Sequence, residues 1–258
     1  MDSPKRTNDP VTTTDFETAQ WTAEELQRKV LEVKPQVAVF DCDGTLWGGD
    51  SGLGFMAWSL EQGIVSRSTS DWIDTRHRAY RAGGVTEAQM CGEMVQIYAG
   101  LRETELREAA ARYVSKFVMP HVFPEIAKVI EALRAAEVEL WVVSSTNKWV
   151  IAEGVRSFEI PESRVLAAEV AVVSGMITDK LVDVPTGEGK ATALRRVSVD
   201  RPDAVFGNSI HDLAMLEMAV NPFPINPSPA LLQAAARNGW GWFRPSGAEV
   251  MTDDIAGK

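Results

Sequence analysis

Cysteine is scarce in this chain of 258 residues, and long apolar runs are missing. Cys42 and Cys91 are the only cysteines and do not form a C-x-x-C pair, so we expect no disulfide framework and take a reducing cytoplasm as the compartment. No stretch of about 18 apolar residues occurs, which argues against a membrane-spanning helix. The segment 1–15 also lacks the apolar core of a signal peptide. We therefore expect a soluble, cytoplasmic protein.

Basic residues are also few, because 26 Lys and Arg stand against 36 Asp and Glu, for a formal net charge of −10. A surface of this sign repels the phosphate backbone of nucleic acid, so we expect neither nucleic-acid nor membrane partners. Hydrophobic residues make up 45% and charged residues 24% of the chain, as in ordinary globular proteins. The sequence does not indicate an oligomeric state.

Short apolar runs followed by helical patterns dominate the remainder. After a polar segment 1–15, expected to be a disordered tail, and a helix expected over 22–33, the runs 37–40, 138–143 and 204–206 are typical of strands buried on both faces of a parallel sheet. Small polar residues follow each of these three runs. The pattern predicts an α/β fold whose ligand site lies at the carboxyl ends of the strands.

The interval between the first two strands is far longer than the dozen or so residues that a crossover requires. Apolar residues in it repeat at helical spacing, as in the set Leu53, Met56, Leu60 and Ile64. We expect a helical cap over 49–119, inserted into a core made of 16–48 and 120–258. A β-hairpin is expected from 165–173 and 176–182, around Ser174-Gly175.

Two carboxylates stand two residues apart after the first strand, in the run Asp41-Cys42-Asp43-Gly44-Thr45-Leu46. Both can face one site while the backbone turns at Gly44 around a cation or a phosphate. One carboxylate can attack phosphorus, and the other, kept protonated by its neighbour's charge, can protonate the leaving group. Asp and Gly also form ordinary turns, so the run alone leaves a plain turn as the alternative.

This run resembles the first motif, DxDGT[LV], of the haloacid dehalogenase-like phosphatase superfamily. The resemblance implies that Asp41 is the nucleophile and that Asp43 is the general acid and base, with its main-chain carbonyl helping to hold Mg²⁺. Thr45 is a candidate for substrate binding. Dehalogenating members typically lack the second aspartate, so Asp43 favours phosphoryl transfer.

The later motifs of the superfamily follow in the expected order, and the resemblance covers about 36–243. Ser144 resembles the hydroxyl donor of the second motif, with Ser145 and Asn147 as further candidates for substrate binding, and Lys190 in GEGK resembles the lysine of the third. An ammonium and a hydroxyl would stabilise a transferring phosphoryl group. Taken singly, a serine after a strand is usually a helix cap, and a lysine is usually a surface residue.

The fourth motif resembles the run Gly207-Asn208-Ser209-Ile210-His211-Asp212. Asn208 stands where the commonest pattern, GDxxxD, has its first aspartate, so it would contribute no charge to a metal. The resemblance implies an Mg²⁺ site formed by Asp41, Asp43, Asn208 and Asp212. Whether Asn208 or Asp212 binds the metal directly stays open. We interpret His211 as a residue of a surface helix.

The order of the motifs and the insertion between the first two are similar to the phosphoserine-phosphatase-like branch. This resemblance implies a Rossmann-like three-layer core with a mainly parallel sheet and an inserted α-helical cap. It also implies Mg²⁺-dependent hydrolysis of a small-molecule phosphomonoester through an aspartyl-phosphate on Asp41. The alternatives are a phosphotransferase with the same intermediate and a catalytically silent phosphometabolite-binding protein, for which Asn208 is the only hint.

The cap is expected to select the leaving group, because Asp41, Ser144 and Lys190 already serve the phosphate. Arg76 shares a helical face with Trp72 and Tyr80, so we expect it to contact the substrate beside aromatic surface. A solvated Arg76 is the alternative.

Overall fold

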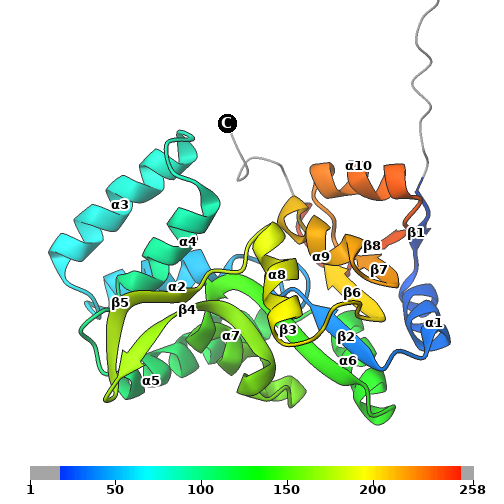
Figure 1. Cartoon of the computed structure of the whole chain (residues 1–258), viewed down its shortest axis with the longest axis horizontal. Coiled ribbons are helices and arrows are strands. Elements are labelled where there is room, and N and C mark those ends of the chain that lie inside the picture. Colours follow the sequence, from blue (N-terminus) through cyan, green and yellow to red (C-terminus); the bar gives the residue numbers. More distant parts are fainter. Residues whose placement is uncertain (1–17, 251–258) are drawn as a thin grey trace, which may run out of the picture.

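A six-stranded sheet with the order β5-β4-β3-β2-β6-β7 forms the centre of the computed structural model, which describes residues 18–250 (Figure 1). Neighbouring strands are parallel except for β4 and β5. The strands are β2 (Val37–Phe40), β3 (Glu139–Asn147), β4 (Val165–Val173), β5 (Met176–Asp183), β6 (Ala204–Gly207) and β7 (Asn221–Pro224). A short parallel pair joins β1 (Gln20–Trp21) to β8 (Trp242–Phe243). The predicted α/β fold with a mainly parallel sheet is confirmed.

Helices cover both faces of the sheet because side chains on a strand alternate between its faces. Ala38 and Phe40 of β2 belong to an apolar cluster with α1 (Ala23–Val33) and α6 (Pro124–Ala135). Val39 belongs to a second cluster with α8 (Glu188–Arg196), α9 (Leu213–Glu217) and α10 (Pro229–Asn238). The core therefore has three layers, and burial on both faces explains why β2 is apolar throughout.

Four α-helices lie between β2 and residue 119, in the segment where the helical cap was predicted. They are α2 (Ser51–Glu61), α3 (Arg67–Arg81), α4 (Glu87–Gln96) and α5 (Glu103–Tyr113). In Figure 1, α3 and α4 stand above the hairpin of β4 and β5, on the side of the molecule opposite to α10. Phe55, Ile73 and Met90 from these helices join the apolar cluster that contains α1 and α6, so one continuous core supports the insertion.

The local structure differs from the prediction at β3. This strand was expected to end at Val143, but it continues to Asn147, because pairing with β4 resumes at Asn147 and Ala168 after an irregularity. Ser144 and Thr146 therefore lie on the strand itself. The predicted hairpin of β4 and β5 is confirmed, with positive φ values of 51° at Ser174 and 77° at Gly175, as a tight turn of two residues requires.

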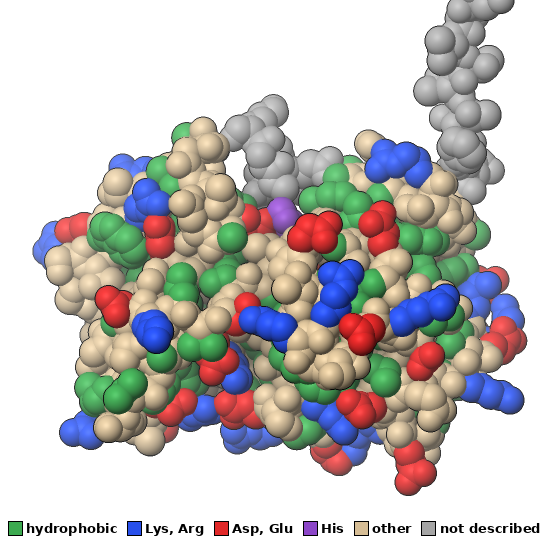
Figure 2. Space-filling view, viewed as in Figure 1, with side chains coloured by type: hydrophobic (Ala, Val, Ile, Leu, Met, Phe, Trp, Pro, Cys, Tyr) green, Lys and Arg blue, Asp and Glu red, His purple; other side chains and the backbone are tan. Residues whose placement is uncertain are grey.

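The N-terminal region begins with a well-capped helix. Thr22 caps α1, and its hydroxyl and amide exchange hydrogen bonds with Glu25, as a capping box does. The tail predicted over 1–15 lies outside the described residues. Within 18–250, no helix is long and apolar enough to span a membrane. Acidic and basic side chains are interspersed over the face shown in Figure 2.

Candidate active site

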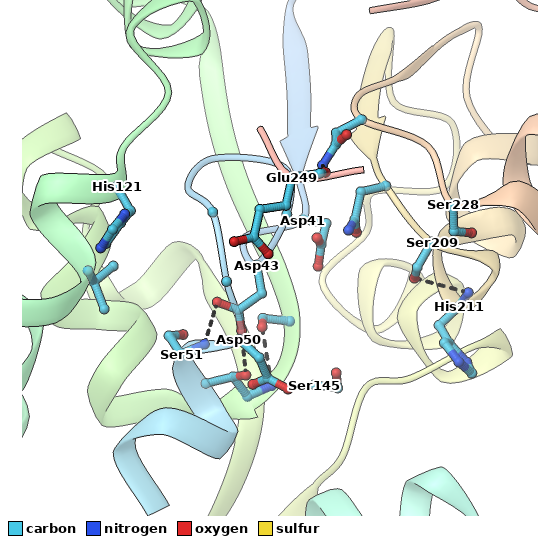
Figure 3. A pocket seen from close by; sticks show the side chains of 18 of the residues that line it. Asp41, Asp43, Asp50, Ser51, His121, Ser145, Ser209, His211, Ser228 and Glu249 are labelled. Carbon is cyan, nitrogen blue, oxygen red and sulfur yellow. Dashed lines mark hydrogen bonds between the residues drawn. The ribbon is translucent and has the colours of Figure 1, made fainter. Parts of the chain in front are cut away.

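The polar residues that end β2, β3 and β6 meet at one edge of the sheet, because these three strands are adjacent and parallel. They surround a cavity of about 580 Å³ (Figure 3). Six of the residues that the sequence singled out line it together: Asp41, Asp43, Ser144, Ser145, Lys190 and Asn208. Parallel topology thus brings three motifs that are distant in sequence into one site.

Asp41 follows β2 and is only 5% exposed. Lys190 Nζ donates to its Oδ1 at 2.7 Å, and Thr45 Oγ1 donates to its Oδ2 at 2.9 Å. Burial and the nearby charge of Asp212 raise the pKa of Asp41 to about 7, against the opposing effect of Lys190. Because a fixed ammonium lies 2.7 Å away, the ionised form of Asp41 that a nucleophile requires is stabilised.

Lys190 bridges two carboxylates in the interior. It is 2% exposed, and its Nζ also lies 2.5 Å from Asp212 Oδ1. Burial lowers the pKa of Lys190, but Asp212 and Asp41 outweigh this effect and raise the pKa above its usual value. The ammonium therefore keeps its charge next to Asp41.

Asp43 is held by three hydrogen-bond donors. Its Oδ1 accepts from Trp47 Nε1 at 2.7 Å and from the Ser51 amide at 2.9 Å, and its Oδ2 accepts from Thr146 Oγ1 at 2.8 Å. Ser51 begins α2, so the inserted helices take part in fixing this carboxylate. Thr146 is absent from the predicted site residues, although Ser144 and Thr146 are two positions apart on a strand and share a face.

Gly44 is required in the turn between Asp41 and α2. Its φ is +78°, and a Cβ added there would lie 2.0 Å from Asn208 Nδ2. The Asn208 side chain therefore packs directly across the backbone of this turn. Asn208 is 4% exposed and lines the cavity.

Asp212 is fully buried, and its two oxygens have partners in the protein. Its Oδ2 accepts from the amides of Asn208 and Ser209 at 2.9 Å each, and its Oδ1 faces Lys190. Asp212 does not line the cavity. Asp212 therefore fixes the loop that carries Asn208, and of the two side chains only Asn208 lines the cavity.

The residues fit Mg²⁺ by the chemistry of their donors. A carboxylate oxygen of Asp41, the main-chain carbonyl of Asp43 and the amide oxygen of Asn208 would supply oxygen ligands, which Mg²⁺ prefers. Within 18–250, no three side chains of His, Cys, Asp or Glu are grouped to hold a metal. Mg²⁺ does not require such a group, because it commonly binds through one or two carboxylates, waters and substrate phosphate.

Three residues predicted to bind substrate do not line the larger cavity. Thr45 is fully buried, and its hydroxyl donates to Asp41. Asn147 caps α7 (Lys148–Gly154) by accepting from the Val150 amide, and it lines a smaller adjoining cavity. Arg76 lines neither cavity, because Glu93 holds its guanidinium with three hydrogen bonds of 2.7 to 3.0 Å. The structure does not bring Arg76 to the site.

His211 is half-buried and faces the inserted helices, so its interpretation as a surface helix residue needs correction. Its Nε2 lies 2.6 Å from Glu87 Oε2, at the start of α4, and Thr186 Oγ1 donates to Glu87 Oε1 at 2.9 Å. His211 and Glu87 both line the larger cavity. No sequence motif includes Glu87, because only the packing of α4 against the core brings this residue to the cavity.

The site thus holds a buried carboxylate between an ammonium and a hydroxyl at the end of a parallel strand, with a second carboxylate two residues further on. The family model described as haloacid dehalogenase-like hydrolase matches residues 38–217. The chain belongs to this family, and the predicted resemblance and hydrolase class are confirmed.

Curated relatives carry phosphatase names. A histidinol-phosphatase of Neisseria meningitidis is 24% identical over 215 residues, which cover 79% of this chain and 96% of that protein. A probable phosphatase of Mycobacterium tuberculosis is 25% identical over 211 residues, which cover 79% of this chain and 73% of that protein. Both alignments extend over most of the described core and insertion.

Solved structures show the same fold. A Bordetella pertussis protein of unknown function has a TM-score of 0.72 at 22% identity, covering 80% of this chain and 97% of that one. A phosphoserine phosphatase in complex with its substrate has a TM-score of 0.55 at 14% identity, and the match covers 83% of this chain and 94% of that one. The fold is that of the phosphoserine-phosphatase-like branch.

Proposed function

We propose that this protein hydrolyses a small-molecule phosphomonoester through an aspartyl-phosphate on Asp41. The observation that carries the proposal is the buried Asp41, held between Lys190 and Thr45, with Asp43 fixed two residues further on at the same cavity. The phosphatase names of the relatives support the same reaction. We further propose that the helices α2 to α5 act as a cap that selects the alcohol part of the substrate.

In the first step, a carboxylate oxygen of Asp41 attacks phosphorus, and the bond between phosphorus and the ester oxygen breaks. Asp43 gives its proton to the departing oxygen, so the product leaves as a neutral alcohol. Lys190 and the hydroxyl of Ser144 bind the phosphoryl oxygens during the transfer. Lys190 is already in place for this role, 2.7 Å from Asp41 Oδ1.

In the second step, Asp43 takes a proton from a water molecule, whose oxygen attacks phosphorus. The bond between Asp41 and phosphorus breaks, inorganic phosphate leaves, and both aspartates return to their starting states. The three donors on Asp43 keep its carboxylate in one position through both proton transfers. Mg²⁺, held by Asp41, the Asp43 carbonyl and Asn208, would neutralise charge on the phosphoryl group when bound.

The experiment compares the wild type with Asp41→Asn on p-nitrophenyl phosphate, with Mg²⁺ and with EDTA. We expect Asp41→Asn to lower kcat by at least about 10³-fold, because the amide cannot form the intermediate. Asp71→Asn, which makes the same change at an exposed position on α3, serves as the control and should keep full activity. Equal rates in Asp41→Asn and the wild type would refute the proposal.

The same assay separates hydrolysis from transfer of the phosphoryl group to an alcohol. Hydrolysis releases one inorganic phosphate for each p-nitrophenol, even when candidate acceptor alcohols are added. A deficit of phosphate that grows with the alcohol concentration would instead identify a phosphotransferase.

A second test concerns Asn208 as a neutral ligand. Asn208→Asp adds a negative charge next to the metal and is nearly isosteric, so we expect the Mg²⁺ concentration for half-maximal activity to fall by about tenfold. Tryptophan fluorescence during Mg²⁺ titration of the enzyme without substrate gives a binding constant that does not depend on turnover. An unchanged Mg²⁺ affinity in Asn208→Asp would show that Asn208 only shapes the loop.

A further inference from the structure

The cavity continues away from Asp41 into a smaller one of about 130 Å³ under the inserted helices. Five residues line both cavities and mark their junction: Asp50, Tyr80, Glu87, Ser145 and Thr146. Met90, Cys91 and Met94 of α4 line only the smaller one. Because the phosphoryl group must lie at Asp41, this extension is where the alcohol part of a substrate would lie.

The two cavities together are lined by a single lysine and no arginine. That lysine is Lys190, which is already paired with Asp41 and Asp212. Three carboxylates beyond the catalytic pair face the same space: Asp50 and Glu87 at the junction and Glu249 from the C-terminal segment (Figure 3 labels the first and the last). The side of the site away from the phosphoryl group therefore carries negative charge without a fixed positive partner.

Asp50 and Glu87 are held by neutral or weakly basic groups. Asp50 Oδ1 accepts from the Leu53 amide at 2.8 Å, and the residue makes no ion pair within the described part of the chain. Burial and the charge of Asp43 raise the pKa of Asp50 to about 6, so its charge is poorly compensated by the protein. Glu87 contacts Thr186 and His211, and no lysine or arginine.

An independent observation also points to a ligand at this place. Ser51 follows Asp50, is 4% exposed and lines the cavity, yet its Oγ has no hydrogen-bond partner. A buried hydroxyl without a partner is unfavourable unless a ligand or water satisfies it. Tyr113 and Phe117 line the same cavity and offer aromatic faces, which attract organic cations.

We propose that the substrate is a phosphomonoester whose alcohol part carries a protonated amine and no carboxylate, and that Asp50 and Glu87 bind this amine. The inference rests on the proposed function, because it takes the phosphoryl group to be at Asp41. Lys190 lies at the phosphoryl end, so the carboxylates without a lysine or arginine partner lie beside the alcohol. A carboxylate on the alcohol would face Asp50 and Glu87 and be repelled.

The test uses three small phosphomonoesters that differ in charge: phosphoethanolamine, its neutral isostere propyl phosphate, and phosphoglycolate. We expect kcat/KM for phosphoethanolamine to exceed that for propyl phosphate by about tenfold or more, because an ammonium within a few ångströms of a partly buried carboxylate gains at least that factor. Phosphoglycolate should be the poorest substrate. Asp41→Asn should abolish phosphate release from all three.

Two variants remove the charge while keeping the shape. Asp50→Asn retains a side chain that caps α2, and Glu87→Gln retains the length of the side chain. Each should lower the ratio of kcat/KM for phosphoethanolamine to that for propyl phosphate by about fivefold to tenfold. Each should also raise kcat/KM for phosphoglycolate. Asp71→Asn changes the net charge equally outside both cavities and should leave the ratio unchanged. Thermal unfolding of each variant checks that it is folded.

The outcomes separate the two proposals. Phosphate release that depends on Asp41 but is fastest for propyl phosphate or phosphoglycolate would overturn this inference and leave the proposed function standing. A ratio that is unchanged in both Asp50→Asn and Glu87→Gln would also overturn it. No release from any ester in the wild type, with p-nitrophenyl phosphate equally inert, would overturn the proposed function itself.

Discussion

The two ends of the cavity are built differently. At the strand ends, Asp41, Lys190 and Asp212 are at most 5% exposed, and each carboxylate has a partner at 2.5 to 2.9 Å. Under the inserted helices, Asp50 is exposed to the cavity and Glu87 is half-buried, and neither contacts a lysine or arginine within the described residues. At the strand ends, the carboxylates have their partners within the protein. Under the inserted helices, the carboxylates lack a lysine or arginine partner, so a ligand could balance their charge.

This difference indicates which part of the site would accept any phosphomonoester and which part would distinguish one substrate from another. In the proposed function, the buried network at the strand ends binds the phosphoryl group, which every phosphomonoester carries. The alcohol part varies between substrates, and Asp50 and Glu87, which are proposed to bind it, belong to the inserted segment, whose sequence can change without disturbing the parallel sheet. Substitutions in the two regions should therefore differ in size and in kind.

The largest effect is expected from Lys190→Met, which leaves the buried Asp41 and Asp212 without a positive charge. Removing one partner of a buried ion pair costs about 3–5 kcal/mol of unfolding free energy. Burial already raises the pKa of Asp41 to about 7, and loss of the ammonium raises it further. The folded variant therefore binds protons more tightly than its unfolded chain, so the loss should be largest at pH 8 and smaller at pH 5.5.

Urea-induced unfolding at these two pH values measures the difference. Lys148→Met is the matched control, because Lys148 pairs with Glu169 at 2.9 Å with both side chains partly exposed. That variant should lose at most about 1 kcal/mol. Equal losses of unfolding free energy in Lys190→Met and Lys148→Met would contradict the view that the buried network at the strand ends depends on Lys190.

A smaller effect is expected from Thr146→Val, which keeps the shape but removes the hydrogen bond to Asp43 Oδ2. Loss of a hydrogen bond to a charged group corresponds to about 1.5 kcal/mol, so kcat should fall by about tenfold with little change in KM. The fall should be larger for propyl phosphate than for p-nitrophenyl phosphate, because an alkoxide needs the proton from Asp43 more.

Thr192→Val, on the exposed side of α8, is the control for Thr146→Val and should match the wild type on both esters. An equal fall on both esters would mean that Thr146 supports the structure of β3 without positioning the acid.

The smallest effect is expected from Arg76→Ala. The sequence predicted that Arg76 contacts the substrate, but the ion pair with Glu93 holds Arg76 outside both cavities. This pair is partly exposed, so we expect a loss of at most about 1 kcal/mol and an unchanged ranking of the three esters. A changed order of kcat/KM among the three esters used for Asp50→Asn would show that Arg76 takes part in substrate binding.

The phosphoryl end of the site was predictable because its residues occur in motifs tied to strand ends. Asp41, Asp43, Ser144, Lys190 and Asn208 line one cavity although Asp41 and Lys190 are 149 positions apart. A run of apolar residues followed by a polar turn indicates where a parallel strand ends, and parallel strands bring such ends to one edge. The motif pattern therefore carried three-dimensional information.

The remaining contacts depended on how separate elements pack. Thr45 was predicted to bind substrate but donates to Asp41, and Arg76 is held by Glu93. Glu87 reaches His211, which is 124 positions further along, only because the start of α4 rests on the loop after β6.

Residues that are close together in the chain are enough to predict the mainly parallel sheet and the order of its motifs, and they make Asp41 the predicted nucleophile. The packing of separate elements decides which oxygens of Asp43 and Asp212 accept hydrogen bonds and which further carboxylates line the cavities. These contacts depend on the direction of each side chain and on its distance from residues of other elements. A spacing along the chain reveals neither.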